Sequence, residues 1–507
     1  MLLKNFAEFQ YVFGGLWQPS PLGYAVEHYF DNGGREALVV RVANGARAAT
    51  LTLNAGAARM TLMAVRPGTR EFLRASVDYD NIPAEDPVRC NLTVQRVRAQ
   101  GGSHVDDQEI FRDLSMDPAS ERHVRDMLAH SELVRVVGDL PGQRPDRTLD
   151  LRGSAAAYVA SNADGDDGAP LTDYDVIGSE LERTGLFSLA AADHFNFLCI
   201  PPLSRETDVG PCAWLAAMRY CKERRALLIV DPPAAWHTAD DALRAIRDWS
   251  LFSENALMYF PRILALDKLR GHFESFAPCG AVAGMLARTD ETCPVWGPAK
   301  FEETVLRPGY RPACLVSEDR RQRLEFRGVN ALQSVRTVAR IGVRPRTLAG
   351  GAAAAADWQS LAARRLALFI VNSIEHGTRW ALNADPDAEF PERVAAQVRG
   401  FLEELHAAGA FGARRREEAF FVRVAKGART AVVEHSNEFQ LLFGFAASRA
   451  QEFHCFRMLY SASGIAVRPV TQGHPHLDRL NPAEYCPEEL AWVNRLARQL
   501  EPPQSRH

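Results

Sequence analysis

The sequence predicts an α/β protein that also carries an all-β piece and an α+β C-terminal domain. Its middle third alternates continuous apolar strands with amphipathic helices, which is the pattern of a parallel sheet buried on both faces. Before that region the chain has short strand-like runs separated by Gly, Pro, Asp and Asn, and after it two helical patterns precede two strands. A chain of 507 residues is expected to form two to four domains.

The all-β piece is predicted from strand-like runs between Leu38 and Val97, and the first of these runs ends the stretch "FDNGGREALVVRV" that begins at Phe30. Gly33 and Gly34 in that stretch have two readings, a turn or a phosphate site. A phosphate site needs a helix that opens directly after the glycines, whereas a strand-like run follows here, so we interpret the glycines as turn residues. Residues 111–137 then change to a helical pattern of apolar positions.

The middle third predicts a βαβαβ unit. A strand at 195–200 precedes a helix at about 211–224, and a second strand follows at 226–233. Thr238 is placed to cap a further helix, and a third strand is expected at 256–261.

The C-terminal part begins after about Gly328 and has an α+β pattern. We expect helices at 358–377 and 391–408 and strands at 419–425 and 452–460, with a Gly/Ala loop at 350–356 before them. Residues 461–507 are expected to hold one amphipathic helix and a frayed tail.

Composition excludes several classes of function. The net charge of -4 argues against a surface that coats nucleic acid, because such binding needs an excess of Lys and Arg. The start of the chain lacks the pattern of a signal peptide, and no apolar run is long enough to span a bilayer, so we expect a protein made and at first kept in a cytoplasm. The nine cysteines form no C-x-x-C pair and are interpreted as reduced core thiols.

Ligands of parallel α/β proteins collect at the strand ends, where this sequence offers the carboxylate of Asp231 and no nucleophile. The G-x-S-x-G, P-loop, G-x-G-x-x-G and H-E-x-x-H patterns are absent. The fragment "EHGTRW" contains the His-Gly-Thr triplet found around a protease histidine, but the serine that such a protease needs is missing. We therefore interpret His376 as the end of a helix that Gly377 caps.

Several segments, in order, resemble the contractile tail sheath proteins of bacteriophages and related injection systems. "NFAEFQYVFGGL" and "AVEHYFDNGGREALVVRV" resemble the family's Phe-Gly-Gly and Asn-Gly-Gly segments. "CGAVAGMLARTDETCPVWGPA" is the most specific match, and "GVNALQ", "RTLAG", "DWQSLAARRLALFIVNSIEHGTRW", "EEAFFVRV" and "EFHCFRM" follow it. The matches span about Asn5 to Tyr460.

The resemblance implies a subtilisin-like α/β sheath domain that is catalytically inert and holds no cofactor or metal. It implies a virion structural protein, encoded by a phage or prophage, whose copies polymerise helically around an inner tube and contract to drive that tube through a target envelope. The implied partners are neighbouring sheath subunits, the inner tail tube protein, and the baseplate and tail-terminator proteins, without nucleic acid or membrane insertion. The implied location is the bacterial cytoplasm during assembly and then the tail sheath.

The resemblance also sets the expected domain boundaries. Residues 1–43 would be the N-terminal part of the α/β core and 44–165 an inserted mainly-β domain. Residues 166–327 would form the subtilisin-like sheath domain, 328–460 the C-terminal α+β sheath domain ending in an arm strand, and 461–507 a tail extension. Family members carry an N-terminal arm before the Phe-Gly-Gly segment, and we expect that arm to be missing here or the start to be set too late.

In the family, terminal arms add strands to a neighbour's sheet. By position, the candidate C-terminal arm strand consists of Glu452, Phe453, His454, Cys455, Phe456, Arg457 and Met458. The alternative is a strand inside its own domain. The helix at 391–408 is expected to face the tube through Arg393 and Arg399. Two other functions stay open: an accessory module that is sheath-like but does not polymerise, and a degenerate α/β hydrolase.

Overall fold

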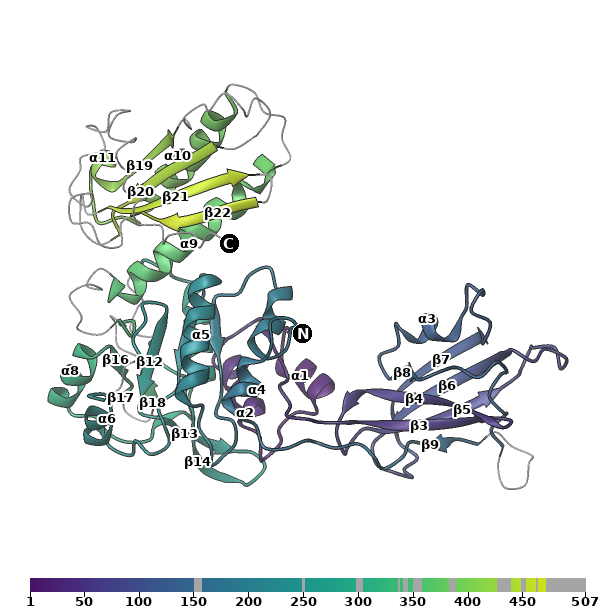
Figure 1. Cartoon of the computed structure of the whole chain (residues 1–507). Helices are drawn as coiled ribbons and strands as arrows, with labels where there is room; N and C mark the ends of the chain where they lie inside the picture. The colour runs from purple at the N-terminus through teal and green to yellow at the C-terminus, as the bar shows by residue number, and fades with distance from the viewer. Residues whose placement is uncertain are drawn as a thin grey trace, which may run out of the picture. The chain divides into compact units, whose positions relative to one another are not determined.

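The computed structural model describes residues 1–149, 157–248, 251–297, 304–335, 338–340, 345–349, 358–382, 389–425, 439–447, 453–461 and 464–470. The chain separates into two compact units (Figure 1). One unit is formed by Met1–Val40 together with the chain from Ser179 onward, and the other by Arg41–Gly178. The expected insert at 44–165 falls inside the second unit.

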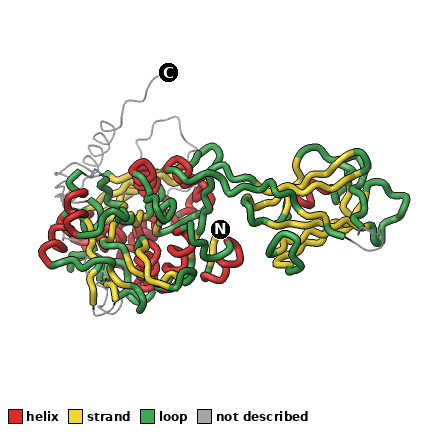
Figure 2. The backbone as a smooth tube through the Cα atoms, turned by 90° about the horizontal axis from the view of Figure 1, so that it is seen from below, coloured by secondary structure: helices red, strands yellow, loops and turns green. Residues whose placement is uncertain are grey.

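The Arg41–Gly178 unit is a sandwich of two antiparallel sheets, with strand orders β3-β4-β8 and β7-β6-β5-β9. Strands dominate it, as Figure 2 shows. Its elements are β3 (Ala48–Ala55), β4 (Ala58–Pro67), β5 (Phe72–Asp78), β6 (Arg89–Val97), β7 (Val105–Ser115), α3 (Val124–Leu128), β8 (Val134–Val137), β9 (Val159–Ala160) and α4 (Asp173–Ile177). Alternate residues such as Leu51, Leu53, Leu92 and Val94 point between the sheets and form one buried core.

A four-stranded parallel sheet, ordered β10-β11-β12-β16, is the centre of the other unit. Its elements are β10 (Phe197–Cys199), α5 (Pro211–Glu223), β11 (Leu227–Val230), α6 (Ala239–Ala245), β12 (Ala256–Phe260) and β16 (Val329–Ala331). Every residue of β11 and β12 is buried, which confirms the parallel sheet predicted from continuous apolar runs. Thr238 caps α6 by accepting a hydrogen bond from the Asp241 N–H, as predicted.

One face of this sheet packs on α7 (Cys279–Asp290) and α2 (Pro21–Asp31), and the cluster includes Leu227, Ile229, Leu257 and Tyr259. A three-stranded antiparallel sheet, β14-β13-β15, joins the same cluster. The remaining elements of this part are β1 (Leu2–Leu3), α1 (Phe6–Phe13), β2 (Ala37–Leu38), η1 (Gly185–Ala191), β13 (Ile263–Asp267), β14 (His272–Phe276), β15 (Arg311–Pro312), α8 (Glu318–Phe326), β17 (Gln333–Val335) and β18 (Val338–Arg340).

The C-terminal part of this unit packs two helices on an antiparallel sheet ordered β19-β20-β21-β22. Its elements are α9 (Leu361–Gly377), η4 (Arg379–Leu382), α10 (Phe390–Ala407), α11 (Arg416–Ala419), β19 (Phe420–Ala425), β20 (Phe439–Phe445), β21 (His454–Ser461) and β22 (Gly464–Pro469). The helix α9 contributes Ile370 and Ile374 to this core and Leu361 and Leu368 to the core beneath the parallel sheet. It therefore links the two parts of the unit.

Several sequence-based expectations were wrong in detail. The strand expected in "REALVVRV" is only two residues long, Ala37–Leu38, and it pairs with Leu2–Leu3. The helix expected in 111–137 is only Val124–Leu128, because β7 continues to Ser115 and occupies the start of that range. The Gly/Ala loop at 350–356 and nearly all of the tail extension at 461–507 lie outside the described residues.

Candidate functional site

Parallel α/β sheets bind ligands at the carboxyl ends of their strands, and Asp231 lies at that end, directly after β11. Its side chain is buried, and its Oδ1 atom accepts a hydrogen bond of 2.9 Å from the backbone N–H of Cys279. Its Oδ2 atom has no hydrogen-bond partner. Burial raises the pKa of Asp231 to about 7, because the charged carboxylate is poorly solvated.

Cys279, at the start of α7, is the potential nucleophile that the sequence reasoning missed. Its thiol is fully buried, and the Cys199 Sγ atom lies 3.7 Å from the Cys279 carbonyl oxygen. Interaction with the Cys199 thiol, then burial and the nearby Asp231 carboxyl, raise the pKa of Cys279 well above its usual value. A cysteine nucleophile reacts as an accessible thiolate, so this arrangement opposes catalysis.

The His-Gly-Thr fragment closes α9, as predicted for a helix end. However, the capping residue is Thr378 and not Gly377, and its N–H donates to the Ile374 carbonyl at 3.0 Å. His376 lies 3.9 Å from the Asp193 carboxylate on an exposed surface, and Arg379 pairs with the same carboxylate. The fragment is therefore part of a surface ion-pair cluster.

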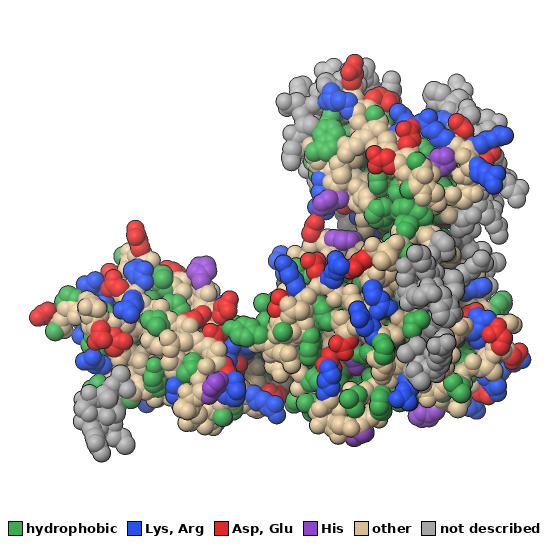
Figure 3. All heavy atoms as spheres, turned by 180° about the vertical axis from the view of Figure 1, so that it is seen from behind, with side chains coloured by type: hydrophobic (Ala, Val, Ile, Leu, Met, Phe, Trp, Pro, Cys, Tyr) green, Lys and Arg blue, Asp and Glu red, His purple; other side chains and the backbone are tan. Residues whose placement is uncertain are grey.

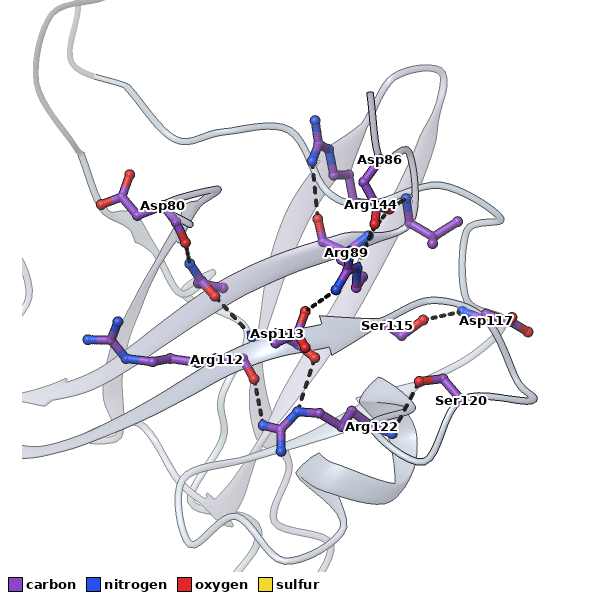
Figure 4. Close-up of polar contacts among 12 residues, drawn as sticks. Asp80, Asp86, Arg89, Arg112, Asp113, Ser115, Asp117, Ser120, Arg122 and Arg144 are labelled. Carbon is purple, nitrogen blue, oxygen red and sulfur yellow. Dashed lines mark hydrogen bonds and ion pairs between the residues drawn. The ribbon is translucent and has the colours of Figure 1, made fainter. Parts of the chain in front are cut away.

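A second polar cluster lies at the bulge between β6 and β7 in the Arg41–Gly178 unit (Figure 4). Asp113 has a φ of 58°, which a residue other than Gly rarely adopts. Its N–H donates to Asn91 Oδ1 at 2.9 Å, its carboxylate pairs with Arg89, and its carbonyl accepts from Arg122 Nε at 3.2 Å. Its polar groups are thus engaged in holding the bulge.

The described residues offer neither a metal centre nor a membrane span. Among the described residues, no group of three or more His, Cys, Asp or Glu side chains is arranged to hold a metal ion. No helix in the described ranges is long and apolar enough to cross a membrane. On the face drawn in Figure 3, basic and acidic side chains are interspersed. Eight cysteines are described, all without a disulfide; Cys212 is exposed, so the expectation of core thiols was wrong there.

The segments that carry the sequence resemblance meet in space around Asn32, which is completely buried. Arg288 of α7 donates from Nη1 to the Asn32 carbonyl at 3.0 Å, and the Arg307 N–H donates to Asn32 Oδ1 at 2.9 Å. Gly33 has a φ of 105°, and a Cβ atom there would lie 2.8 Å from the Arg288 Cβ atom. The glycine therefore permits both the turn and the contact with α7, as the turn interpretation predicts.

Two glycines of α7 bring that helix against α2. A Cβ atom on Gly280 would lie 2.1 Å from the Ala25 carbonyl oxygen, and one on Gly284 would lie 2.1 Å from the Tyr29 carbonyl oxygen. The spacing of four residues places both glycines on one face of α7. The glycines of the "CGAVAGMLARTD" segment thus allow α7 to pack closely against the backbone of α2.

No family model and no curated protein matches the sequence. Among solved structures, the sheath tail protein from Desulfitobacterium hafniense is similar at a TM-score of 0.50 and 11% identity, over 91% of this chain and 92% of that chain. The chain has the fold of a tail sheath protein.

Two further solved structures are similar over a smaller part. The sheath complex of an extracellular contractile injection system, PVC, in its contracted state has a TM-score of 0.43 and 20% identity, over 53% of this chain and 73% of that chain. The helical sheath of the anti-feeding prophage in its contracted state has a TM-score of 0.42 and 18% identity, over 58% of this chain and 75% of that chain.

The candidate arm strand includes β21, a strand of the C-terminal sheet. β21 is hydrogen-bonded to β20 on one side and to β22 on the other. Phe453 and Cys455 are buried on one face, while Met458 and Tyr460 are buried on the other, against α9 and α10. Glu452 lies outside the described residues. The edge strands of this sheet are β19 and β22.

The candidate tube-facing residues lie on α10, whose apolar stripe packs into the C-terminal core. Arg393 is exposed and its guanidinium lies 5.8 Å from the centre of the Phe390 ring, whereas Arg399 is half-buried. The exposed side of the helix also carries Glu403, which pairs with Arg416. The surface of α10 is therefore mixed in charge.

Proposed function

We propose that this protein is the structural subunit of a contractile tail sheath. Its copies would polymerise helically around an inner tube and contract to drive the tube through a target envelope. The observation that carries the proposal is the similarity to the Desulfitobacterium hafniense sheath tail protein, because it extends over nine-tenths of both chains. Assembly would take place in the bacterial cytoplasm, and the mature location would be the tail of a virion or a phage-tail-like particle.

The local chemistry supports a structural role over the degenerate hydrolase. Asp231 is buried with a raised pKa, and the Cys279 thiol beside it is sealed from solvent. A hydrolase needs an accessible nucleophile that a base within hydrogen-bond reach activates. The test is labelling of the folded protein with serine- and cysteine-reactive hydrolase probes, followed by peptide mapping. Labelling at Cys279 would support the degenerate hydrolase over the structural role.

The sheath role also requires contacts with neighbouring sheath subunits, an inner tube protein, and the baseplate and tail-terminator proteins. Such an assembly forms through a heterologous contact between subunits, which repeats from copy to copy without closing into a ring. The alternative is a sheath-like accessory module that binds a sheath end without polymerising. Electron microscopy of the purified chain at micromolar concentration, alone and with its tube protein, separates these functions. Striated tubes or stacked rings support the sheath subunit, and monodisperse particles in both samples support the accessory module.

We further propose that α10 faces the inner tube through Arg393 and Arg399. The test is the double variant Arg393→Glu and Arg399→Glu, measured by co-sedimentation with preformed tubes. The expected result is a loss of tube binding, because both substitutions reverse a charge. The matched control reverses Arg59 and Arg98 in the Arg41–Gly178 unit. Equal tube binding by both double variants would contradict the assignment.

A further inference from the structure

A hydrogen-bonded turn at residues 179–184, called here the Leu181 turn, presents one leucine almost entirely to solvent. Leu181 is 95% exposed. The Thr184 N–H donates to the Ser179 carbonyl at 3.0 Å, and the Ser179 N–H donates to Thr184 Oγ1 at 2.9 Å. The turn is therefore ordered before any partner binds, which reduces the entropy lost on binding.

Leu181 lies between two exposed carboxylates, Glu180 and Glu182. Among the described residues, neither carboxylate forms an ion pair within 4.0 Å. The chain that follows the turn packs on α5, since the Phe187 and Tyr220 rings lie 5.8 Å apart and Arg224 donates to the Leu189 carbonyl at 3.1 Å. The Leu181 turn is thus an apolar tip flanked by two carboxylates, with the exposed Arg183 as its one positive charge.

The outer side of the β13–β14 hairpin carries exposed apolar side chains next to a positive charge. Leu266 and Phe273 are paired across the two strands and are 46% and 47% exposed, and Leu269 in the connecting turn is 55% exposed. The Arg311 guanidinium of β15 lies 4.8 Å from the centre of the Phe273 ring. In the described part of the chain, no carboxylate pairs with Arg311. We call Leu266, Leu269, Phe273 and Arg311 the hairpin face.

The two features lie on opposite sides of the parallel sheet. The inner side of the hairpin packs through Ile263, Ala265 and Phe276 into the cluster formed with α7 and α2. Parallel strands in the order β10-β11-β12 have right-handed crossovers, so α5 and α6 lie together on one face. The cluster with α7 and α2 covers the other face. One copy therefore presents the Leu181 turn and the hairpin face on opposite sides of its parallel sheet.

We propose that the Leu181 turn of one copy of this chain docks on the hairpin face of a second copy. The apolar tip would cover Leu266 and Phe273, and the Glu180 and Glu182 carboxylates would lie next to the Arg311 guanidinium, which has no carboxylate partner within its own described chain. A contact between two different surfaces of the same chain is heterologous and continues from copy to copy. The inference rests on the proposed sheath function and names one of its subunit contacts.

Two single variants test the contact from its two sides. Leu181→Asp removes the tip, and Phe273→Asp places a charge on the face; both positions are exposed, so the fold should be kept, which circular dichroism checks. We expect each variant alone to shift the concentration for assembly at least about tenfold upward in sedimentation velocity. Phe326→Asp is the matched control, because Phe326 on α8 is 64% exposed and belongs to neither the turn nor the hairpin face.

Mixing the two variants gives a sharper result. The Leu181→Asp chain keeps its hairpin face, and the Phe273→Asp chain keeps its turn, so an equimolar mixture should form a one-to-one dimer that cannot grow. Charge exchange gives an independent readout. Glu182→Arg and Arg311→Glu should each weaken assembly, and the chain carrying both should recover, because the pair is restored between copies with its sign reversed.

The outcomes separate this contact from the sheath function. If the wild type polymerises and both Asp variants polymerise equally well, the contact is overturned and the sheath function stands. Monomeric variants that form no dimer on mixing also overturn the contact. A wild-type chain that never assembles, alone or with its tube protein, overturns the proposed function together with the contact.

Discussion

Gly284 of α7 lies directly against the backbone of Tyr29 on α2, since a Cβ atom on the glycine would come within 2.1 Å of the Tyr29 carbonyl oxygen. The helices touch through backbone at this point, and no flexible side chain is available to move aside. The most specific sequence match to sheath proteins is therefore explained by packing between two segments that are far apart in the chain.

Gly284→Ala is expected to lower the free energy of unfolding by about 2–3 kcal/mol, because the added methyl group forces α7 away from α2. The measurement is denaturant unfolding followed by tryptophan fluorescence. Gly400→Ala is the control, because a Cβ atom there meets nothing within 4 Å on the helix α10. It should stabilise the protein by about 0.5–1 kcal/mol. Equal effects of the two substitutions would contradict the close packing.

Asp231→Asn is expected to change the pH dependence of stability. Burial raises the pKa of Asp231 to about 7 in the folded protein, so the protonated carboxyl favours the folded state. That contribution is complete below pH 4 and is lost as the pH rises through 7. The variant should therefore gain on the order of 2–3 kcal/mol relative to wild type between pH 5 and pH 8. Unfolding curves at both pH values measure the difference, and an unchanged offset would rule out a raised pKa.

Much of the fold was predictable from local pattern, because the residues of β11 and β12 are continuously apolar and Thr238 is a strong helix cap. The pairing of Leu2–Leu3 with Ala37–Leu38 was missed, since strands of two residues carry no periodic signal. β20 was missed although its sequence, "FQLLFGF", is apolar apart from Gln440. The candidate site was less predictable. The contact between Asp231 and Cys279 joins residues 48 apart in the chain, and burial of the thiol depends on tertiary packing.

His28 should make the protein sensitive to acid. Burial, with smaller contributions from Lys268 and Arg205, lowers its pKa to about 3, so the neutral ring favours the folded state. The stabilisation is complete above pH 6.5 and is lost as the pH falls toward 3. His28→Leu should reduce the loss of stability between pH 7.5 and pH 4.5 by about 2–3 kcal/mol. His130→Leu, at an exposed histidine, is the matched control for the substitution itself.

Cysteine reactivity should follow burial. In the folded protein, a maleimide at pH 7.5 is expected to modify the exposed Cys212 at least about a hundredfold faster than Cys279, because only an accessible thiolate reacts. Peptide mapping over time measures both rates, and labelling in denaturant shows that both thiols are intrinsically competent. Rapid labelling of Cys279 under native conditions would show that the strand-end site opens to solvent.

The place of β21 in its sheet predicts a hydrogen-exchange pattern that bears on strand donation. β21 has a hydrogen-bonded neighbour on each side, and its side chains Met458 and Tyr460 are buried in the C-terminal core. Its amides should therefore exchange at least about a hundredfold more slowly than the outward amides of β22, which pairs on one side only. Exchange of the isolated chain, resolved by mass spectrometry of peptides, measures this ratio. Fast exchange throughout β21 would mean that the strand leaves its own sheet readily, as a donated arm must. Slow exchange would instead place any strand addition to this sheet at its free edges, β19 or β22, because an added strand needs unpaired backbone groups.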